Sequence, residues 1–431
     1  MSKQERSPTQ PTDTQRDIGK PVGYFELILQ NANFRWLWGG QVVSLLGDWF
    51  NLIASAILIA ELTDSGLALG ILFTIRMLAP FAVAPIAGIF ADRYNRKHLL
   101  IITDIVRAVV VLGFLFVRDA NDIWLLYALT TVLFGVSGFF SPARSAILPD
   151  VTSPQELGTA NTLGAATWSV MLAVGAAIGG LTTGLFGSQT AFIIDGCTFA
   201  VSAGLLLKIR LPGTSSTAGE TPGRAKLTAL RYMFQRPDIL IIAIHKAAIS
   251  LLMSTGVQVV LVEISNSYFV IGVGGALSLG MIYCVNGIGS GIGPILARRW
   301  TGDRDKPLRV SITLGYLIAV IGIAIMAPLS NFETVLFGGL VRSIGGGIVW
   351  VFSTQLLLQR APNQIRGRIF GTEFALFTLM GGASSMMIGM LLDRFQIPMI
   401  LWGIAALNLI PALLWGLWCR HHNRAGQKRE N

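Results

Sequence analysis

The chain has 431 residues, of which 52% are hydrophobic and only 13% charged, and its mean hydropathy is +0.62. Soluble domains carry about 25% charged residues, so the composition excludes an ordinary soluble globular protein. The formal net charge of +10 would suit a nucleic-acid-binding protein, but the charges are distributed as in a membrane protein, so no nucleic acid is expected.

Apolar runs of about 20 residues recur throughout and predict an all-α membrane protein with twelve transmembrane helices. Residues 1–33 are polar and lack the apolar core of a cleaved signal, so the first run should be retained as a span. The expected spans are 34–62, 67–91, 98–117, 123–145, 160–186, 189–208, 238–264, 270–297, 308–328, 334–358, 366–392 and 397–419.

Lysine and arginine sort sharply between the two sides of these spans. Of the 33 such residues, 27 lie on one side, four lie within spans, and only Arg118 and Arg394 lie on the other side. By the positive-inside rule, this predicts a multi-pass protein of the cell (inner) membrane with both termini in the cytoplasm.

A stretch rich in Gly, Ser, Thr and Pro, residues 211–224, separates two six-helix halves. Three faint matches between the halves, at shifts of 205 to 208 residues, favour an internal duplication. The expected organisation is a cytoplasmic segment 1–33, a six-helix bundle 34–208, a cytoplasmic linker 209–237, a six-helix bundle 238–419 and a cytoplasmic tail 420–431.

A basic turn follows the second span, with the sequence Gly88-Ile-Phe-Ala-Asp92-Arg93-Tyr-Asn-Arg96-Lys97. Four charges in six residues cannot stay in hydrocarbon, so this turn must lie at a membrane surface. The pattern Gly-x-x-x-Asp-Arg-x-x-Arg-Lys resembles the loop signature of the major facilitator superfamily, which the chain resembles along nearly its whole length. The resemblance implies the facilitator fold, with two halves around a site near the midplane.

By this resemblance, the turn is a cytoplasmic latch that joins the halves and breaks when the cavity opens inward. Asp92 would bind the start of span 11, where Arg366, Gly367 and Arg368 lie. We expect Arg93, Arg96 and Lys97 to reach lipid phosphates. The alternative is a positively charged loop with no moving part.

A similar pattern, Gly389-Met-Leu-Leu-Asp393-Arg394, falls on the opposite side of the membrane and is interpreted as coincidence. Other stretches, among them Ser44-Leu-Leu-Gly47-Asp48-Trp49-Phe50 and Asp104-Ile-Val-Arg107, resemble the macrolide-efflux and enterobactin-exporter-like branch. That branch implies export of drug-like or siderophore-like molecules coupled to proton flow. The fifth span carries Gly175-Ala-Ala-Ile-Gly179-Gly180, with Ala where antiporters of the family often have Pro, which weakens the antiport inference.

Charges within spans need a partner or a function, because buried charge is costly in hydrocarbon. Asp48 and Arg76 lie at similar depths on neighbouring spans and form a candidate pair, with Asp48 the first choice for a proton-carrying group. A permanent structural ion pair is the alternative. Lys246 and Glu373 form a second candidate pair, either structural or engaged in proton coupling or substrate contact.

Arg342 has no obvious partner and is a candidate cationic contact for substrate, whereas Asp104, Arg107 and Asp195 are expected to brace helices. His245 is expected to pack beside Lys246. Three tryptophans inside spans are candidates for lining an apolar cavity: Trp49, Trp168 and Trp350.

No Walker loop, zinc-ligand spacing or catalytic dyad occurs, so no enzyme activity, cofactor or metal is expected. The leading hypothesis is a monomeric secondary transporter that exports small amphipathic compounds by alternating access, with protons as coupling ion. Alternatives are a facilitator that imports or flips a metabolite or lipid, a membrane receptor or scaffold without transport, and a membrane enzyme.

Overall fold

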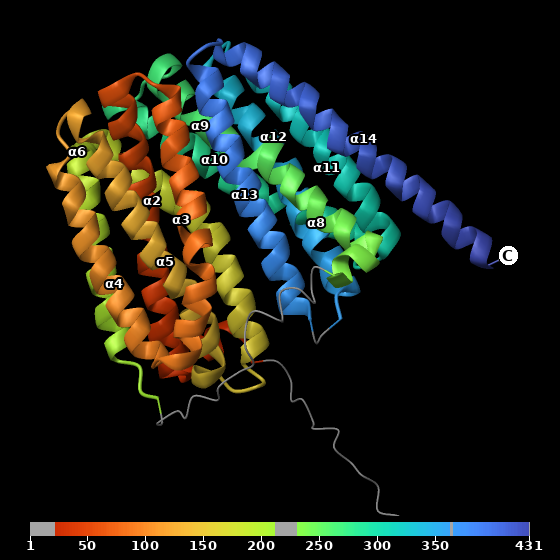
Figure 1. Ribbon diagram of the computed structural model, residues 1–431, viewed down its shortest axis with the longest axis horizontal. Coiled ribbons are helices and arrows are strands. Elements are labelled where there is room, and N and C mark those ends of the chain that lie inside the picture. The colour runs from red at the N-terminus through yellow and green to blue at the C-terminus, as the bar shows by residue number, and fades with distance from the viewer. Residues whose placement is uncertain (1–21, 212–230, 363–364, 431) are drawn as a thin grey trace, which may run out of the picture.

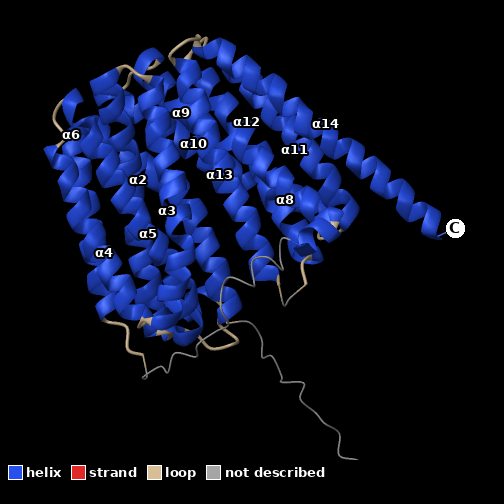
Figure 2. Ribbon diagram, viewed as in Figure 1, coloured by secondary structure: helices blue, strands red, loops and turns tan. Residues whose placement is uncertain are grey.

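The computed structural model describes residues 22–211, 231–362 and 365–430, which form helices joined by short loops (Figure 2). The side chains of Asp92 and of residues 421–430 are outside the described set. Most of the predicted segment 1–33 and of the predicted linker 209–237 also lies outside the described residues.

The first half comprises α1 Tyr24–Gln30, α2 Ala32–Thr63, α3 Gly66–Arg93, α4 Arg96–Gly113, η1 Phe114–Phe116, η2 Ala120–Asp122, α5 Ile123–Val151 and α6 Leu157–Leu207. The second half comprises α8 Pro237–Ile249, η3 Ser250–Ser254, α9 Thr255–Glu263, η4 Ile264–Tyr268, η5 Val273–Gly275, α10 Ala276–Thr301, α11 Asp305–Met326, α12 Phe332–Arg360, α13 Arg366–Leu392 and α14 Ile397–Glu430. Because α14 continues to Glu430, the predicted tail 420–431 extends the last helix and does not follow it as a separate segment.

Eleven stretches of the described residues are long and apolar enough to cross a membrane, and one of them, α6, contains two spans. Gly187 has φ +80° and ψ +166°, which no helix accommodates, so the chain turns there. Before the turn α6 runs parallel to α2, since Trp38 bonds Thr167 and Trp49 lies against Gly175 further along. The twelve predicted spans are therefore confirmed.

Short polar side chains begin several spans, because the first N–H groups of a helix lack partners within it. The side-chain oxygens of Asn31, Ser65, Asn95 and Asn331 accept hydrogen bonds from backbone N–H groups three residues later. Within hydrocarbon the remaining backbone groups bond inside each helix, which is why the spans are helical throughout.

Helices α1–α6 and α8–α14 form two bundles side by side, coloured red to yellow and green to blue in Figure 1. The bundles meet mainly through α3 with α13 and α6 with α10. Glycines allow this approach: a Cβ on Gly180 would lie 2.5 Å from Gly280 Cα, and one on Gly70 would lie 2.6 Å from the Ser385 carbonyl oxygen. Small residues at such positions let the backbones of two helices approach closely in a membrane.

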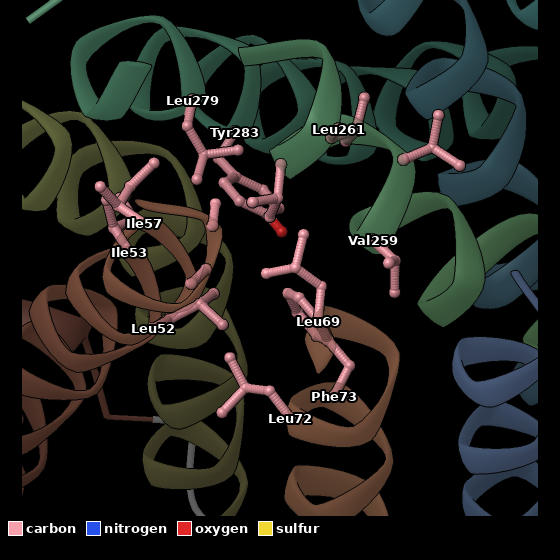
Figure 3. Close-up of a cluster of buried hydrophobic side chains, with 14 of the residues drawn as sticks. Leu52, Ile53, Ile57, Leu69, Leu72, Phe73, Val259, Leu261, Leu279 and Tyr283 are labelled. Carbon is pink, nitrogen blue, oxygen red and sulfur yellow. The ribbon is translucent and has the colours of Figure 1, made fainter. Parts of the chain in front are cut away.

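Near one end of the bundle, the interface between the halves is filled by apolar side chains (Figure 3). Helices α2 and α3 contribute from the first half, and α9 and α10 from the second. The labelled members are Leu52, Ile53, Ile57, Leu69, Leu72, Phe73, Val259, Leu261, Leu279 and Tyr283, all less than 8% exposed. We call this cluster the plug, and the end where it lies the closed end.

Candidate functional site

The opposite end, which we call the basic end, carries the turn between α3 and α4 and the start of α13. Among the described residues of this end, three glycines face open space: a Cβ added to Gly88, Gly367 or Gly371 would meet nothing within 4 Å. In Figure 1, α3 and α13 lie close together at the top and diverge toward the bottom. The structure is therefore closed at one end and separated at the other.

The basic turn bonds within its own half in this conformation. Arg96 forms an ion pair of 2.7 Å with Asp150 of α5, and Lys97 Nζ donates to the carbonyl oxygens of Leu207 and Ile209 at 2.9 and 2.7 Å. A cation at these carbonyls is favoured, since they end the α6 helix. Arg96 and Lys97 thus have protein partners, which corrects the expectation that they reach lipid phosphates; Arg93 is exposed.

The facing turn also bonds internally, since Arg366 donates to the carbonyl oxygens of Leu358 and Ala361 at 3.3 Å. Arg368 follows it in the first turn of α13. The described side chains show no bond between Arg366 and the α3–α4 turn, and the Asp92 side chain lies outside the described set. Engagement of the latch therefore stays a prediction.

The first half holds a buried group of ionisable side chains near the middle of the membrane. Arg76 donates to Asn51 Oδ1 at 3.1 Å and lies 4.2 Å from the centre of the Phe134 ring. The ion pairs formed by described residues within 4.0 Å do not include Asp48, so the predicted direct Asp48–Arg76 pair is wrong. Asp48 is partly buried and feels the charges of Arg107 and Arg76 at longer range.

The bracing role expected of Asp104 and Arg107 is confirmed, because the two form a buried ion pair on α4. Ser202 of α6 donates to the second Asp104 oxygen at 2.6 Å. Arg107 also lies over the rings of Phe140 and Phe199 at 4.4 and 4.3 Å. This pair joins α4, α5 and α6.

Asp195 differs from the bracing residue expected from the sequence. It is fully buried, and its carboxylate makes no hydrogen bond of standard geometry among the described residues, although the Asn51 side chain lies near it. It lies against α2 where Gly47 leaves room, since a Cβ there would be 2.4 Å from Asp195 Oδ1. The Asp195 carboxyl group interacts electrostatically with the charged side chains of Asp48, Arg107 and Arg76. Three carboxyl groups and two guanidinium groups therefore share this region.

In the second half, the predicted Lys246–Glu373 ion pair is confirmed at 2.7 Å, with side chains 2% and 4% exposed. Lys246 Nζ also donates to Thr354 at 2.9 Å and lies 4.0 Å from the centre of the Trp350 ring. Trp350 is 36% exposed and meets Phe377 edge-on at 5.0 Å. A buried ion pair thus lies directly behind an aromatic surface.

His245, next to Lys246 on α8, contacts other helices than Lys246 does. Its ring lies 4.3 Å from that of Trp415, and its Nδ1 is 3.3 Å from the Tyr316 hydroxyl. His245 is therefore packed, as expected, but against Trp415 and Tyr316.

Span 7 contains a π-helical turn, η3, that the apolar sequence did not reveal. Its carbonyl oxygens at Leu251, Leu252 and Met253 accept hydrogen bonds from three other helices. The donors are Ser384 at 2.6 Å, Asn408 at 3.0 Å and Arg342 at 3.0 Å. Such turns are frequent at functional sites, and Arg342 is the donor here that sequence reasoning had left without a partner.

Aromatic residues from both halves meet at the plug. Tyr283 of α10 packs against Trp49 of α2 at 5.5 Å between ring centres, and its hydroxyl has no partner among the described residues. The charges of Arg76 and Arg342, one from each half, act on Tyr283. Trp168 of α6, the third predicted cavity residue, is 57% exposed. Aromatic rings from both halves and one guanidinium group from each half therefore lie in the same region.

Comparison with known proteins agrees with this architecture. The family model of the Major Facilitator Superfamily matches residues 37–372. The chain is 25% identical over 409 residues to a candidate bacilysin exporter, BacE, of Bacillus subtilis, covering 92% of this chain and 98% of that one. It is 25% identical to the multidrug efflux pump Tap of Mycolicibacterium fortuitum, covering 84% of this chain and 92% of that one.

Among solved structures, a bacterial homologue of the human lysosomal transporter Spinster, in an inward-facing and unoccupied conformation, superposes with a TM-score of 0.74. The match covers 90% of this chain and 97% of that one at 15% identity, so it concerns the fold alone.

Proposed function

The chain belongs to the major facilitator superfamily of transporters, and we propose that it exports small amphipathic compounds across the cytoplasmic membrane by alternating access, coupled to protons. The names of its relatives BacE and Tap support export. The substrate is a drug-like or siderophore-like molecule, and the transporter acts as a monomer.

The observation that carries this proposal is the difference between the two ends. Between two packed halves, the plug fills the interface at the closed end, while the glycines of the basic end face no atom of the other half. Alternating access requires two such arrangements, in which the halves rock about a central site and separate at one end at a time. The plug and the latch would then close in turn.

Orientation follows from the basic residues. The positive-inside rule assigns the basic end and both termini to the cytoplasm, so this conformation opens inward. An exporter loads its substrate in that state. Trp49, Tyr283 and Trp350 supply apolar contact area, and Arg342 supplies a cation, with Lys246 and Trp168 as further contacts.

The direct test is flux in proteoliposomes that carry the purified protein and an imposed pH gradient. A panel of fluorescent amphipathic compounds should accumulate against their own gradients only while the pH gradient lasts. Downhill movement that ignores the pH gradient would favour the facilitator, and absence of any substrate-dependent flux would favour a receptor or scaffold.

Proton coupling is assigned to the buried group around Asp48 and Asp195. Three carboxylates and two guanidinium groups leave one negative charge in excess, and such a buried charge is costly in a medium of low dielectric constant. Binding of one proton to a carboxylate makes the group neutral. We expect Asp48→Asn and Asp195→Asn each to abolish accumulation driven by the pH gradient while downhill substrate exchange continues.

A matched control is Asp303→Asn, which neutralises a carboxylate that is 56% exposed at the membrane surface. Its pH-driven flux should equal that of the unaltered protein. If both buried variants retained full pH-driven accumulation, the proton site would have to lie elsewhere, with Glu373 the remaining candidate.

A further inference from the structure

The carboxylate of Asp393, at the end of α13, binds the first turn of α3 in the other half. Asp393 Oδ1 accepts from the Gly66 N–H at 2.6 Å and from the Leu67 N–H at 3.3 Å. Oδ2 lies 3.3 Å from the Leu67 nitrogen and 3.4 Å from Ser65 Oγ. One side chain of the second half therefore reaches three donors of the first.

These contacts complete the N-terminus of α3. Its first N–H groups have no partner within the helix, and Ser65 satisfies only that of Ala68, at 3.3 Å. The N–H groups of Gly66 and Leu67 depend on Asp393 for a protein partner. A negative charge at this position is also favoured by the positive end of the helix. When the halves separate here, both N–H groups must turn to water.

The backbones of α3 and α13 approach closely beside this contact. A Cβ on Gly389 would lie 2.6 Å from the Gly66 carbonyl oxygen and 2.9 Å from Gly70 Cα. One turn further, Thr74 Oγ1 lies 2.9 Å from the Gly382 carbonyl oxygen. Gly389 thus allows the approach that brings Asp393 onto the helix end.

The sequence around Asp393 repeats the pattern of the basic turn at the other end of the same pair of helices. Gly389 and Asp393 end α13 at the closed end, as Gly88 and Asp92 end α3 at the basic end. The interpretation of the second pattern as coincidence needs correction, because Asp393 makes an interhelical contact.

We propose that Asp393 is a positioning residue of the transport cycle: it latches the closed end while the basic end is open and releases when the closed end opens. This inference rests on the proposed alternating access and adds the residue that holds the outer closure. Since water replaces the lost bonds after release, the latch biases the equilibrium without locking it.

The test measures the distance across the closed end directly, without substrate or proton gradient. Spin labels at Phe116→Cys and Val270→Cys, both exposed and one from each half, are placed in a chain whose three native cysteines are replaced. Asp393→Ala should increase the population of the long distance about tenfold, the typical scale of a lost helix cap at a charged terminus. Asp393→Asn, which still accepts hydrogen bonds, should shift it less.

Two further variants sharpen the result. Gly389→Ala should shift the distances the same way for a different reason, by inserting a methyl group between the helices. Asp64→Asn removes an exposed carboxylate from the loop between α2 and α3, next to the helix end that Asp393 contacts, and should change nothing. An Asp393→Ala distribution equal to that of Asp64→Asn would overturn the proposal, as would a lowered thermal midpoint with unchanged distances. Neither result depends on whether the protein transports.

Discussion

Replacing Lys246 with methionine should destabilise the protein by about 3–5 kcal/mol, because the Glu373 carboxylate would remain buried without its counter-charge. The two side chains are almost inaccessible, and the ion pair is only 2.7 Å long. Breaking a buried pair costs more than the pair itself contributes, since the remaining ion has already lost its water. Thermal unfolding of the detergent-solubilised protein measures the effect as a fall in midpoint.

The double variant Lys246→Met/Glu373→Met separates this cause from lost packing. With both charges removed, much of the lost stability should return, since an apolar pair is often as stable as a buried ion pair. Arg298→Met serves as the control. Arg298 is 64% exposed and its ion-pair partner Asp303 is 56% exposed. Such surface ion pairs contribute roughly 0–1 kcal/mol to stability. A Lys246→Met midpoint as high as that of Arg298→Met would contradict the prediction.

The sequence predicted this pair because the depth of a residue in a membrane can be counted along its helix. Depth alone does not say which way a side chain points around the helix. Asp48 and Arg76 match in depth, yet Arg76 is bonded to Asn51, three positions from Asp48. The twelve spans could be predicted without knowing any side-chain direction, because only the length of each apolar run was needed.

Two other features were beyond sequence reasoning for related reasons. The η3 turn lies in an apolar run whose only glycine, Gly256, follows the turn by two residues, and a lone glycine does not identify a change of helix type. The surroundings of Asp393 and Asp195 are set by how closely two helices approach, and that depends on glycines at the contact, Gly389 four residues before Asp393 and Gly47 on another helix from Asp195. The signal available in the sequence was the presence of these glycines, because glycines in spans indicate where two helices approach closely.

Locking either end of the molecule should arrest transport completely. At the closed end, a Cβ on Gly184 of α6 would lie 3.2 Å from Leu277 Cβ of α10, near the separation that a disulfide requires. The pair Gly184→Cys/Leu277→Cys should therefore crosslink in the resting protein, without substrate. Flux should fall to background and return after reduction.

At the basic end, crosslinking should be favoured during turnover and not in the resting protein. The halves are apart there, so Asp92→Cys/Gly367→Cys should crosslink slowly at rest and faster during turnover, when the basic end closes. This pair should also stop flux, reversibly. The single variants Gly184→Cys and Gly367→Cys, in a chain whose three native cysteines are replaced, cannot form a disulfide between the halves and should keep transport under the same oxidising conditions. Full transport in a protein crosslinked between the halves would mean that they do not rock, because a fixed pair of bundles cannot open its two ends in turn.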